Sequence, residues 1–142
     1  HAVRSASTEQ VEDIDKMDYI KQIFEIYDGN ILLQPPCQSK ISTEVPQEMR
    51  SILSISNGIQ ETMNDPKTGQ AVVIGWIIYP YDMMMSDTDF YKAVYKIDGI
   101  VFSSDGAGNS FVIKANGTIV CFNGIDGEET EVADSLSNFF EM

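Results

Sequence analysis

The chain has 142 residues, of which 43% are hydrophobic, and this composition predicts one packed domain rather than a disordered chain. Its 22 acidic residues against 9 basic ones give a formal net charge of −13, which argues against nucleic acid or an anionic membrane as the ligand. A basic protein partner is electrostatically favoured, although acidity can also serve solubility alone.

The N-terminal part predicts an amphipathic helix after a short polar start. Residues 1–10 are mostly small and polar, and we expect a disordered or vector-derived segment there. Over Val11–Tyr27, apolar residues recur at three- and four-residue steps, which is typical of a helix with one buried face. Asp28-Gly29-Asn30 supplies the stop. The remaining chain, residues 11–142, is expected to form a single domain.

A connector and a second helix follow. Pro35-Pro36 can continue neither a helix nor a central strand, so the segment to about Ile41 is predicted to be a connector. Proline is favoured in the first turn of a helix, and Val45-Pro46 precedes apolar residues at helical spacing. We therefore expect a short helix that stops before Asn57-Gly58.

The middle of the chain predicts a buried strand and an interrupted helix. After a loop at residues 64–69, the run Val72–Tyr79 has the β-branched and aromatic content of a buried central strand, and Pro80 ends it. Apolar residues in Tyr81–Lys96 favour helical structure with an interruption. The methionines Met83–Met85 are expected in the core, with an adaptable binding surface as the alternative.

Three short strands are predicted between Gly99 and Phe122. Asn116-Gly117 is a strong signal for a two-residue type I′ hairpin, because both central residues of that turn need a positive φ. Counting outward from this turn pairs Ile113 with Val120. The count places four apolar residues on one face that must be covered: Phe111, Ile113, Val120 and Phe122.

The C-terminal part is acidic. Asn123–Thr130 is predicted to be a glycine-rich loop, and residues 132–140 an amphipathic closing helix. No basic residue follows Lys114, so one end of the fold should be strongly negative. Acids in the first turn of a helix also interact favourably with its dipole, so a purely structural role for these acids is the alternative. In that case the docking surface is expected around Asp82–Asp89. The candidate partner-binding residues are Asp126, Glu128, Glu129, Glu131 and Asp134.

The sequence contains no recognisable catalytic or metal-binding constellation. The one histidine is His1, so a Ser–His or Cys–His pair would lack a positioned member. Asp105–Asn109 contains a Gly-x-Gly sequence, but it leads into a predicted strand, whereas a phosphate loop opens a helix, and it lacks calcium-loop spacing. We therefore expect no enzymatic activity, no cofactor and no metal.

Cysteine usage and hydropathy bear on location. Cys37 and Cys121 fit no metal-binding spacing, and both are expected to be free thiols. The longest apolar run, Ala71–Tyr81, is shorter than the ~18 residues of a membrane span. With no signal-peptide region visible either, we expect a cytoplasmic protein.

Four segments of the chain, taken together, resemble a known family. They are Val45–Gly58, Trp76–Pro80, Ile100–Ile119 and Val132–Phe140. The first resembles the helix that begins Leu-Pro and ends Asn-Gly in the SUKH superfamily, the Smi/Knr-type domain, although Val45 replaces the leucine. The second resembles its strand leading into Tyr-Pro, the third its Ser-Asp-Gly meander, and the fourth its closing helix.

The resemblance, together with the predicted elements, implies an α+β fold, an antiparallel or mixed sheet meander with amphipathic helices packed against it. The superfamily includes bacterial immunity proteins against secreted toxins and fungal regulators of glucan synthesis. We therefore expect a bacterial immunity protein that occludes a basic toxin domain, as a monomer or weak dimer. A regulator or scaffold of cell-wall synthesis is the alternative, and a carboxylate-based hydrolase is a third, less favoured hypothesis.

Overall fold

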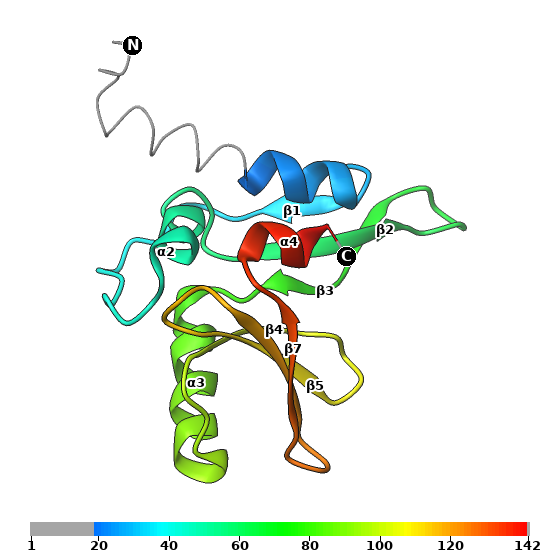
Figure 1. The fold of residues 1–142 in the computed structure, drawn as a ribbon. Coiled ribbons are helices and arrows are strands. Elements are labelled where there is room, and N and C mark those ends of the chain that lie inside the picture. Colours follow the sequence, from blue (N-terminus) through cyan, green and yellow to red (C-terminus); the bar gives the residue numbers. More distant parts are fainter. Residues whose placement is uncertain (1–18, 142) are drawn as a thin grey trace, which may run out of the picture.

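Figure 1 shows the computed structural model, which describes residues 19–141. A helix whose described part spans residues 19–26 precedes the first strand. The elements that follow are β1 (Ile31–Leu33), α2 (Gln47–Leu53), β2 (Ile59–Asn64), β3 (Ala71–Ile78), α3 (Tyr81–Tyr95), β4 (Ile100–Ser104), β5 (Asn109–Ile113), β6 (Ile119–Asn123), β7 (Glu129–Ala133) and α4 (Leu136–Phe140).

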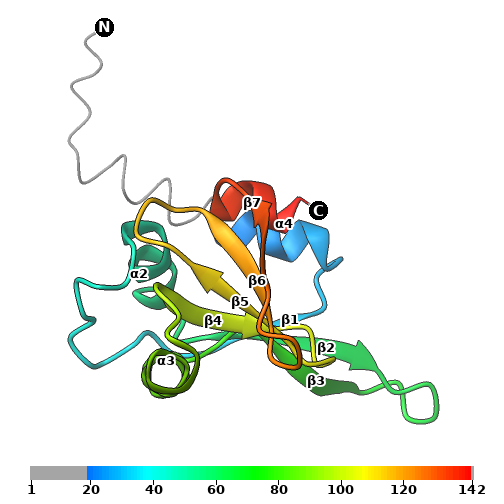
Figure 2. The ribbon, with the colours of Figure 1, turned by 60° about the horizontal axis from the view of Figure 1, so that its bottom comes forward.

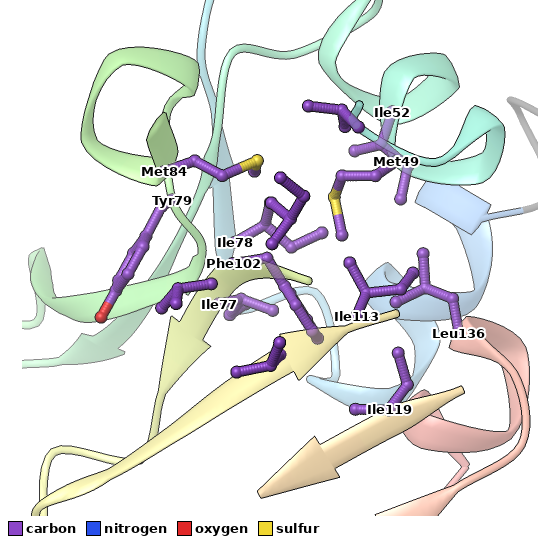
Figure 3. Packing of buried hydrophobic residues seen from close by; sticks show 14 of the residues in the cluster. Met49, Ile52, Ile77, Ile78, Tyr79, Met84, Phe102, Ile113, Ile119 and Leu136 are labelled. Atoms are coloured by element: carbon purple, nitrogen blue, oxygen red, sulfur yellow. The ribbon is translucent and has the colours of Figure 1, made fainter. Parts of the chain in front are cut away.

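The strands form two antiparallel sheets, one with the order β1-β2-β3 and one with the order β4-β5-β6-β7. The predicted α+β class is confirmed. The two sheets meet where Tyr79, just after β3, donates its backbone N–H to the carbonyl of Phe102 on β4 at 2.9 Å. Figure 3 shows the core at this junction, where Met49 of α2, Met84 of α3 and Leu136 of α4 converge on both sheets.

The first helix ends where its sequence predicts. Asp28 and Gly29 have positive φ values, and the Gly29 N–H donates to the carbonyl of Phe24 at 2.8 Å, as in a glycine-terminated helix. The helix is tied to the C-terminus because Gln22 donates to the carbonyl of Ser137 at 2.8 Å. The predicted start at Val11 and the expectations for residues 1–10 lie outside the described residues.

The second helix is confirmed as α2, with Met49, Ile52 and Leu53 fully buried. The Asn57-Gly58 pair that follows it joins this helix to the next one. The Asn57 carboxamide oxygen accepts from the Tyr81 N–H at 2.8 Å, at the start of α3. Gly58 has a φ of 93°, and a Cβ there would lie 2.8 Å from the Pro80 nitrogen, so glycine permits the close approach.

Two strands of the β1–β2–β3 sheet were not predicted from the sequence, and the environment of its third strand was misjudged. The predicted connector contains β1, and the polar segment Ile59–Asn64 forms β2, which pairs with both of its neighbours. Residues 71–78 do form a strand, β3, but it lies at the edge of its sheet and only its second half is buried. The helix after it, α3, is continuous rather than interrupted.

The hairpin between β5 and β6 has a different turn and register from those predicted. Gly117 has a φ of 92°, but Asn116 does not have a positive φ, and the Gly117 N–H donates to the carbonyl of Lys114 at 2.9 Å. This is a turn followed by a glycine bulge, which is one residue longer than a type I′ connection. As a result, Ile113 pairs with Ile119 and not with Val120.

The one-residue shift divides the predicted apolar face between the two sides of the sheet. Phe122 contacts Tyr91 of α3, with ring centroids 5.7 Å apart. Phe111 contacts Phe139 of α4 on the opposite side, at 4.9 Å. Helices therefore cover both faces of the β4–β7 sheet.

The acidic C-terminal loop is shorter than predicted, and the closing helix begins later. Residues 129–133 form β7, in which Glu129 pairs with Phe122 and Ala133 with Ile119 of β6. Helix α4 starts only at Leu136, where the Ser135 side chain accepts the Asn138 N–H as the N-cap. Val132 and Ala133 are thus strand residues, because pairing with β6 extends the sheet by a fourth strand.

Candidate functional site

The five predicted acidic residues lie along the β6–β7 hairpin and the segment that leads into α4, and three of them have roles inside the fold. Asp126 accepts the Glu128 N–H at 2.9 Å and so shapes the turn. Glu129 forms an ion pair with Lys114, 2.9 Å between Oε1 and Nζ. Asp134 accepts a hydrogen bond from the side-chain amide of Asn138.

The other two, Glu128 and Glu131, are exposed, and neither carboxylate has a hydrogen bond or ion pair with any residue in the range 19–141. The helix-dipole explanation of the cluster is wrong, because the first turn of α4 contains no acid. Beside these acids, at the tip of the hairpin, the Ile125 side chain is 90% exposed. The β6–β7 hairpin therefore presents an apolar side chain beside unpaired carboxylates.

A groove, which the sequence reasoning did not find, lies where the two sheets meet. It consists of two adjacent hollows of about 330 and 280 Å³ that share Glu61, Trp76, Ser104 and Asp105. We call it the inter-sheet groove. Its remaining lining includes the aromatic side chains of Tyr27, Phe111, Phe139, Phe140 and Tyr79.

Asp105 organises the β4–β5 loop beside this groove. One carboxylate oxygen accepts from the Ala107 N–H at 2.8 Å and from the Asn109 N–H at 3.3 Å, and the other accepts from the Asn109 side chain at 2.8 Å. The hydrogen bond from the Asn109 side chain, followed by those from the backbone, holds the pKa of Asp105 below its ordinary value. The motif that resembles a phosphate loop is thus a self-capped turn.

Three other groups near the groove have raised pKa values. Burial, together with the nearby Glu61 charge, raises the pKa of the Tyr27 hydroxyl. Burial also raises the pKa of Tyr79, and this effect exceeds the lowering caused by a hydrogen bond with Ser104. The pKa of the Cys121 thiol is raised by burial and then by the Asp105 charge, which is the opposite of what a nucleophilic cysteine requires.

The predicted thiols are found free, as Cys37 and Cys121 form no disulfide. Within residues 19–141, no group of three or more histidine, cysteine, aspartate or glutamate side chains is placed to hold a metal ion. The helices of this described part all lack the combination of length and apolar character needed to cross a membrane.

A third surface feature is the outer part of the β2–β3 hairpin, which extends away from the rest of the fold in both views (Figure 1, Figure 2). It carries four partly exposed apolar residues: Met63, Val72, Val73 and Ile74. Its charges balance, since between Thr62 and Ile74 there is one acid, Asp65, and one base, Lys67. This hairpin is the neutral, apolar part of an acidic molecule.

One comparison with known proteins gives a match. A sequence model of the SMI1/KNR4 family (SUKH-1) matches residues 36–142. No curated protein and no solved structure matches the chain significantly. The matched range includes the acidic hairpin and the groove residues Glu61, Trp76 and Asp105, whereas the first helix and Tyr27 precede it.

Proposed function

Because the chain belongs to the SMI1/KNR4 family (SUKH-1), we propose that it is a protein-binding module, and specifically an immunity protein that neutralises a toxin by direct contact in the cytoplasm. In this proposal it is not an enzyme: it occludes a basic surface of the toxin and forms no covalent bond with it. The raised pKa of the Cys121 thiol makes this cysteine a poor nucleophile.

The observation that carries the proposal is the pairing state of the acids on the β6–β7 hairpin. In a chain with a net charge of −13, Glu128 and Glu131 are exposed and have no partner among residues 19–141. Unpaired surface carboxylates do little for stability, but they attract a basic partner over distances up to the Debye length.

The exposed Ile125 adds the second element of a protein interface. Charged pairs at an interface mainly set the association rate and the orientation of the partner. Affinity depends more on a few side chains that become buried and lose contact with water. Ile125 is placed to be such a side chain, since it lies at the hairpin tip next to Asp126.

The test uses two double variants that remove equal charge from different faces. Glu128→Gln with Glu131→Gln removes the unpaired hairpin acids and leaves the Glu129–Lys114 ion pair intact. Asp82→Asn with Asp89→Asn is the matched control, because both aspartates are exposed on α3, the other docking candidate. Both variants should melt within a few degrees of the wild type, since surface substitutions cost within about 0.5 kcal/mol.

An immunity gene is expected to lie beside the gene of its toxin, so the product of the adjacent gene is the partner to test. The first readout is growth of cells that co-express the two proteins. The second is stopped-flow association of the two purified proteins at several salt concentrations. We expect the hairpin variant alone to protect less, to associate several-fold more slowly and to show a flatter salt dependence. Protection lost only in the α3 variant would move the docking face to that helix. If the adjacent product is not toxic and acts in cell-wall synthesis instead, the immunity proposal fails.

A further inference from the structure

The inter-sheet groove combines negative charge with aromatic walls. Two carboxylates, those of Glu61 and Asp105, border it, and none of the side chains that line its two hollows is basic. Trp76 lines both hollows, and the aromatic residues Tyr27, Phe111 and Phe139 line the larger one. A site of this composition favours a cation that can also lie against an aromatic ring.

The two carboxylates differ in their availability. Asp105 is engaged by Ala107 and Asn109 through three hydrogen bonds, so its oxygens are occupied within its own loop. Glu61 is only partly exposed, and its carboxylate has no hydrogen bond or ion pair with any residue in the described range 19–141. Glu61 is therefore the group in the groove that is free to receive a positive charge.

The residue opposite Glu61 leaves space for a ligand. Glu61 on β2 pairs with Gly75 on β3, and a Cβ added at Gly75 would meet no atom within 4 Å. The smaller hollow is lined by Gly75 together with Ile74 and Trp76. The absence of a side chain at residue 75 thus keeps the space beside the Glu61 carboxylate open.

We propose that the inter-sheet groove receives an arginine side chain of the protein partner, with Glu61 as its counter-ion and the ring of Tyr27 as its stacking surface. The proposal rests on the proposed function, because it assigns one specific contact of the basic partner. It adds a second contact region to the β6–β7 hairpin, and one in which the charge is desolvated rather than merely attracted.

Arginine fits this groove better than lysine for two reasons. The guanidinium group is planar, so it can lie flat on the Tyr27 ring while it presents two N–H donors to the Glu61 carboxylate. It is also more weakly hydrated than an ammonium group, so that its transfer into a half-enclosed groove costs less. Hydrogen-bond partners for its remaining donors are near, since Ser103 and Ser104 line the same space.

The experiment uses the full chain and no toxin. Trp76 is the single tryptophan and lines both hollows, so a change in its fluorescence reports binding there. The wild-type protein is titrated with Nα-acetyl-arginine amide, and in parallel with the citrulline analogue, which has the same shape without the charge. We expect a saturable change with the arginine compound and only a weak linear change with the citrulline compound.

Two variants and one control locate the effect. Glu61→Gln removes the counter-ion, and we expect about tenfold weaker binding, the factor that ~1.4 kcal/mol represents. Gly75→Leu fills the open space from the opposite strand, and the saturable change should disappear while the fold is retained, since Gly75 has no positive φ. Asp98→Asn is the matched control, because it removes one exposed acid outside the groove and should titrate like the wild type.

The results separate this inference from the proposed function. Equal responses to arginine and citrulline, or unchanged binding by both Glu61→Gln and Gly75→Leu, would overturn the groove assignment even if the protein neutralises a toxin. Equal binding of Nα-acetyl-lysine amide would overturn the assignment of a guanidinium group. A saturable, Glu61-dependent response in a protein that neutralises no toxin would support the groove chemistry and leave only the immunity proposal rejected.

Discussion

Helices cover both faces of the β4–β7 sheet, whereas the outer half of the β2–β3 hairpin has apolar side chains exposed on both of its faces. In the β4–β7 sheet, Val112 and Ile113 point to opposite sides and are both fully buried. In the hairpin, the neighbouring Val72 and Val73 also point to opposite sides, and they are 42% and 48% exposed. The same residue types thus have opposite environments in the two sheets.

The edge strands β4 and β3 differ in the same way. The edge strand β4 is closed by tertiary contacts, because the Val101 N–H donates to the Thr88 hydroxyl at 2.9 Å and the Phe102 carbonyl accepts from Tyr79. Strand β3 is an edge strand of its sheet, and its outer half is exposed. The difference indicates that the β4–β7 sheet holds much of the buried core, whereas the outer half of the β2–β3 hairpin contributes little to it.

The sharpest way to break this comparison is to remove the same atoms from both regions. Ile113→Ala should lower the free energy of unfolding by about 2–5 kcal/mol, because Ile113 is fully buried and truncation leaves a cavity. Ile74→Ala removes a side chain that is 51% exposed, and it should cost less than about 1 kcal/mol. Urea denaturation of both variants measures the two costs.

Equal costs for the two isoleucines would contradict the division of roles between the sheets. A large effect of Ile74→Ala would mean that the hairpin is packed in solution, for example against a second copy of the chain. Sedimentation of the wild-type protein at several concentrations distinguishes that case, because a packed hairpin would then come with a concentration-dependent mass.

A second pair of substitutions tests the comparison at the backbone, with a smaller expected effect. Gly99, before β4, has a φ of 126°, and a Cβ there would lie 2.7 Å from Val112 Cγ1 and 2.9 Å from the Ile113 carbonyl oxygen. Gly99→Ala should therefore cost about 1–3 kcal/mol. Gly75→Ala should be neutral or stabilise by up to ~1 kcal/mol, since the space is open and glycine weakens a strand.

Thermal unfolding of the two glycine variants gives the measurement, and the wild type is the common reference. If Gly75→Ala destabilises as much as Gly99→Ala, the space beside Gly75 is filled in solution. That outcome would also remove the basis for using Gly75→Leu to block the groove.

The sequence predicts those parts of the fold whose signals are local. The stop at Asp28-Gly29, helix α2 and the limits of β3 each depend on a few neighbouring residues, and the structure confirms these predictions. The strand β2 has no such signal, because Gln60, Glu61 and Thr62 are polar and their strand conformation depends on pairing with β3. Its existence is a property of the assembled sheet.

The hairpin register shows a different limit. Asn116-Gly117 fits both a type I′ turn and a turn with a glycine bulge, and the two differ by the one residue that exchanges the faces. A usable signal was present in the adjacent apolar pairs Val112-Ile113 and Ile119-Val120, which indicate burial on both sides. A single covered face would have required alternation.

The two candidate sites also differ in whether a local sequence signal predicts them. The acidic hairpin was visible as composition, although only the structure separates the unpaired Glu128 and Glu131 from Glu129, whose partner is Lys114. The groove could not be found in this way, because its lining comes from segments as distant as Tyr27, Glu61 and Phe139. No local pattern brings these residues together.

The smallest expected difference concerns the hairpin loops of the two sheets, each of which is organised by an aspartate. The Asp105 carboxylate accepts three hydrogen bonds in the β4–β5 loop. The Asp65 carboxylate accepts one in the β2–β3 loop, from the backbone N–H of Lys67 at 2.9 Å. Asp105→Ala should therefore cost about 1 kcal/mol, with exposure limiting the effect, and Asp65→Ala about half as much or less.

The pH dependence identifies the source of the Asp105 effect. Because hydrogen bonds lower its pKa in the folded state, the unfolded chain binds a proton more readily than the native protein does. The contribution of Asp105 is therefore complete above the ordinary pKa of 3.8 and is lost as the pH falls through the lowered value. Urea denaturation at about pH 7 and about pH 3 should show the gap between wild type and Asp105→Ala narrowing at the acidic pH. A gap that stays constant would mean that the Asp105 carboxylate acts by shape alone, and that the two loops differ in length and packing rather than in the charge that organises them.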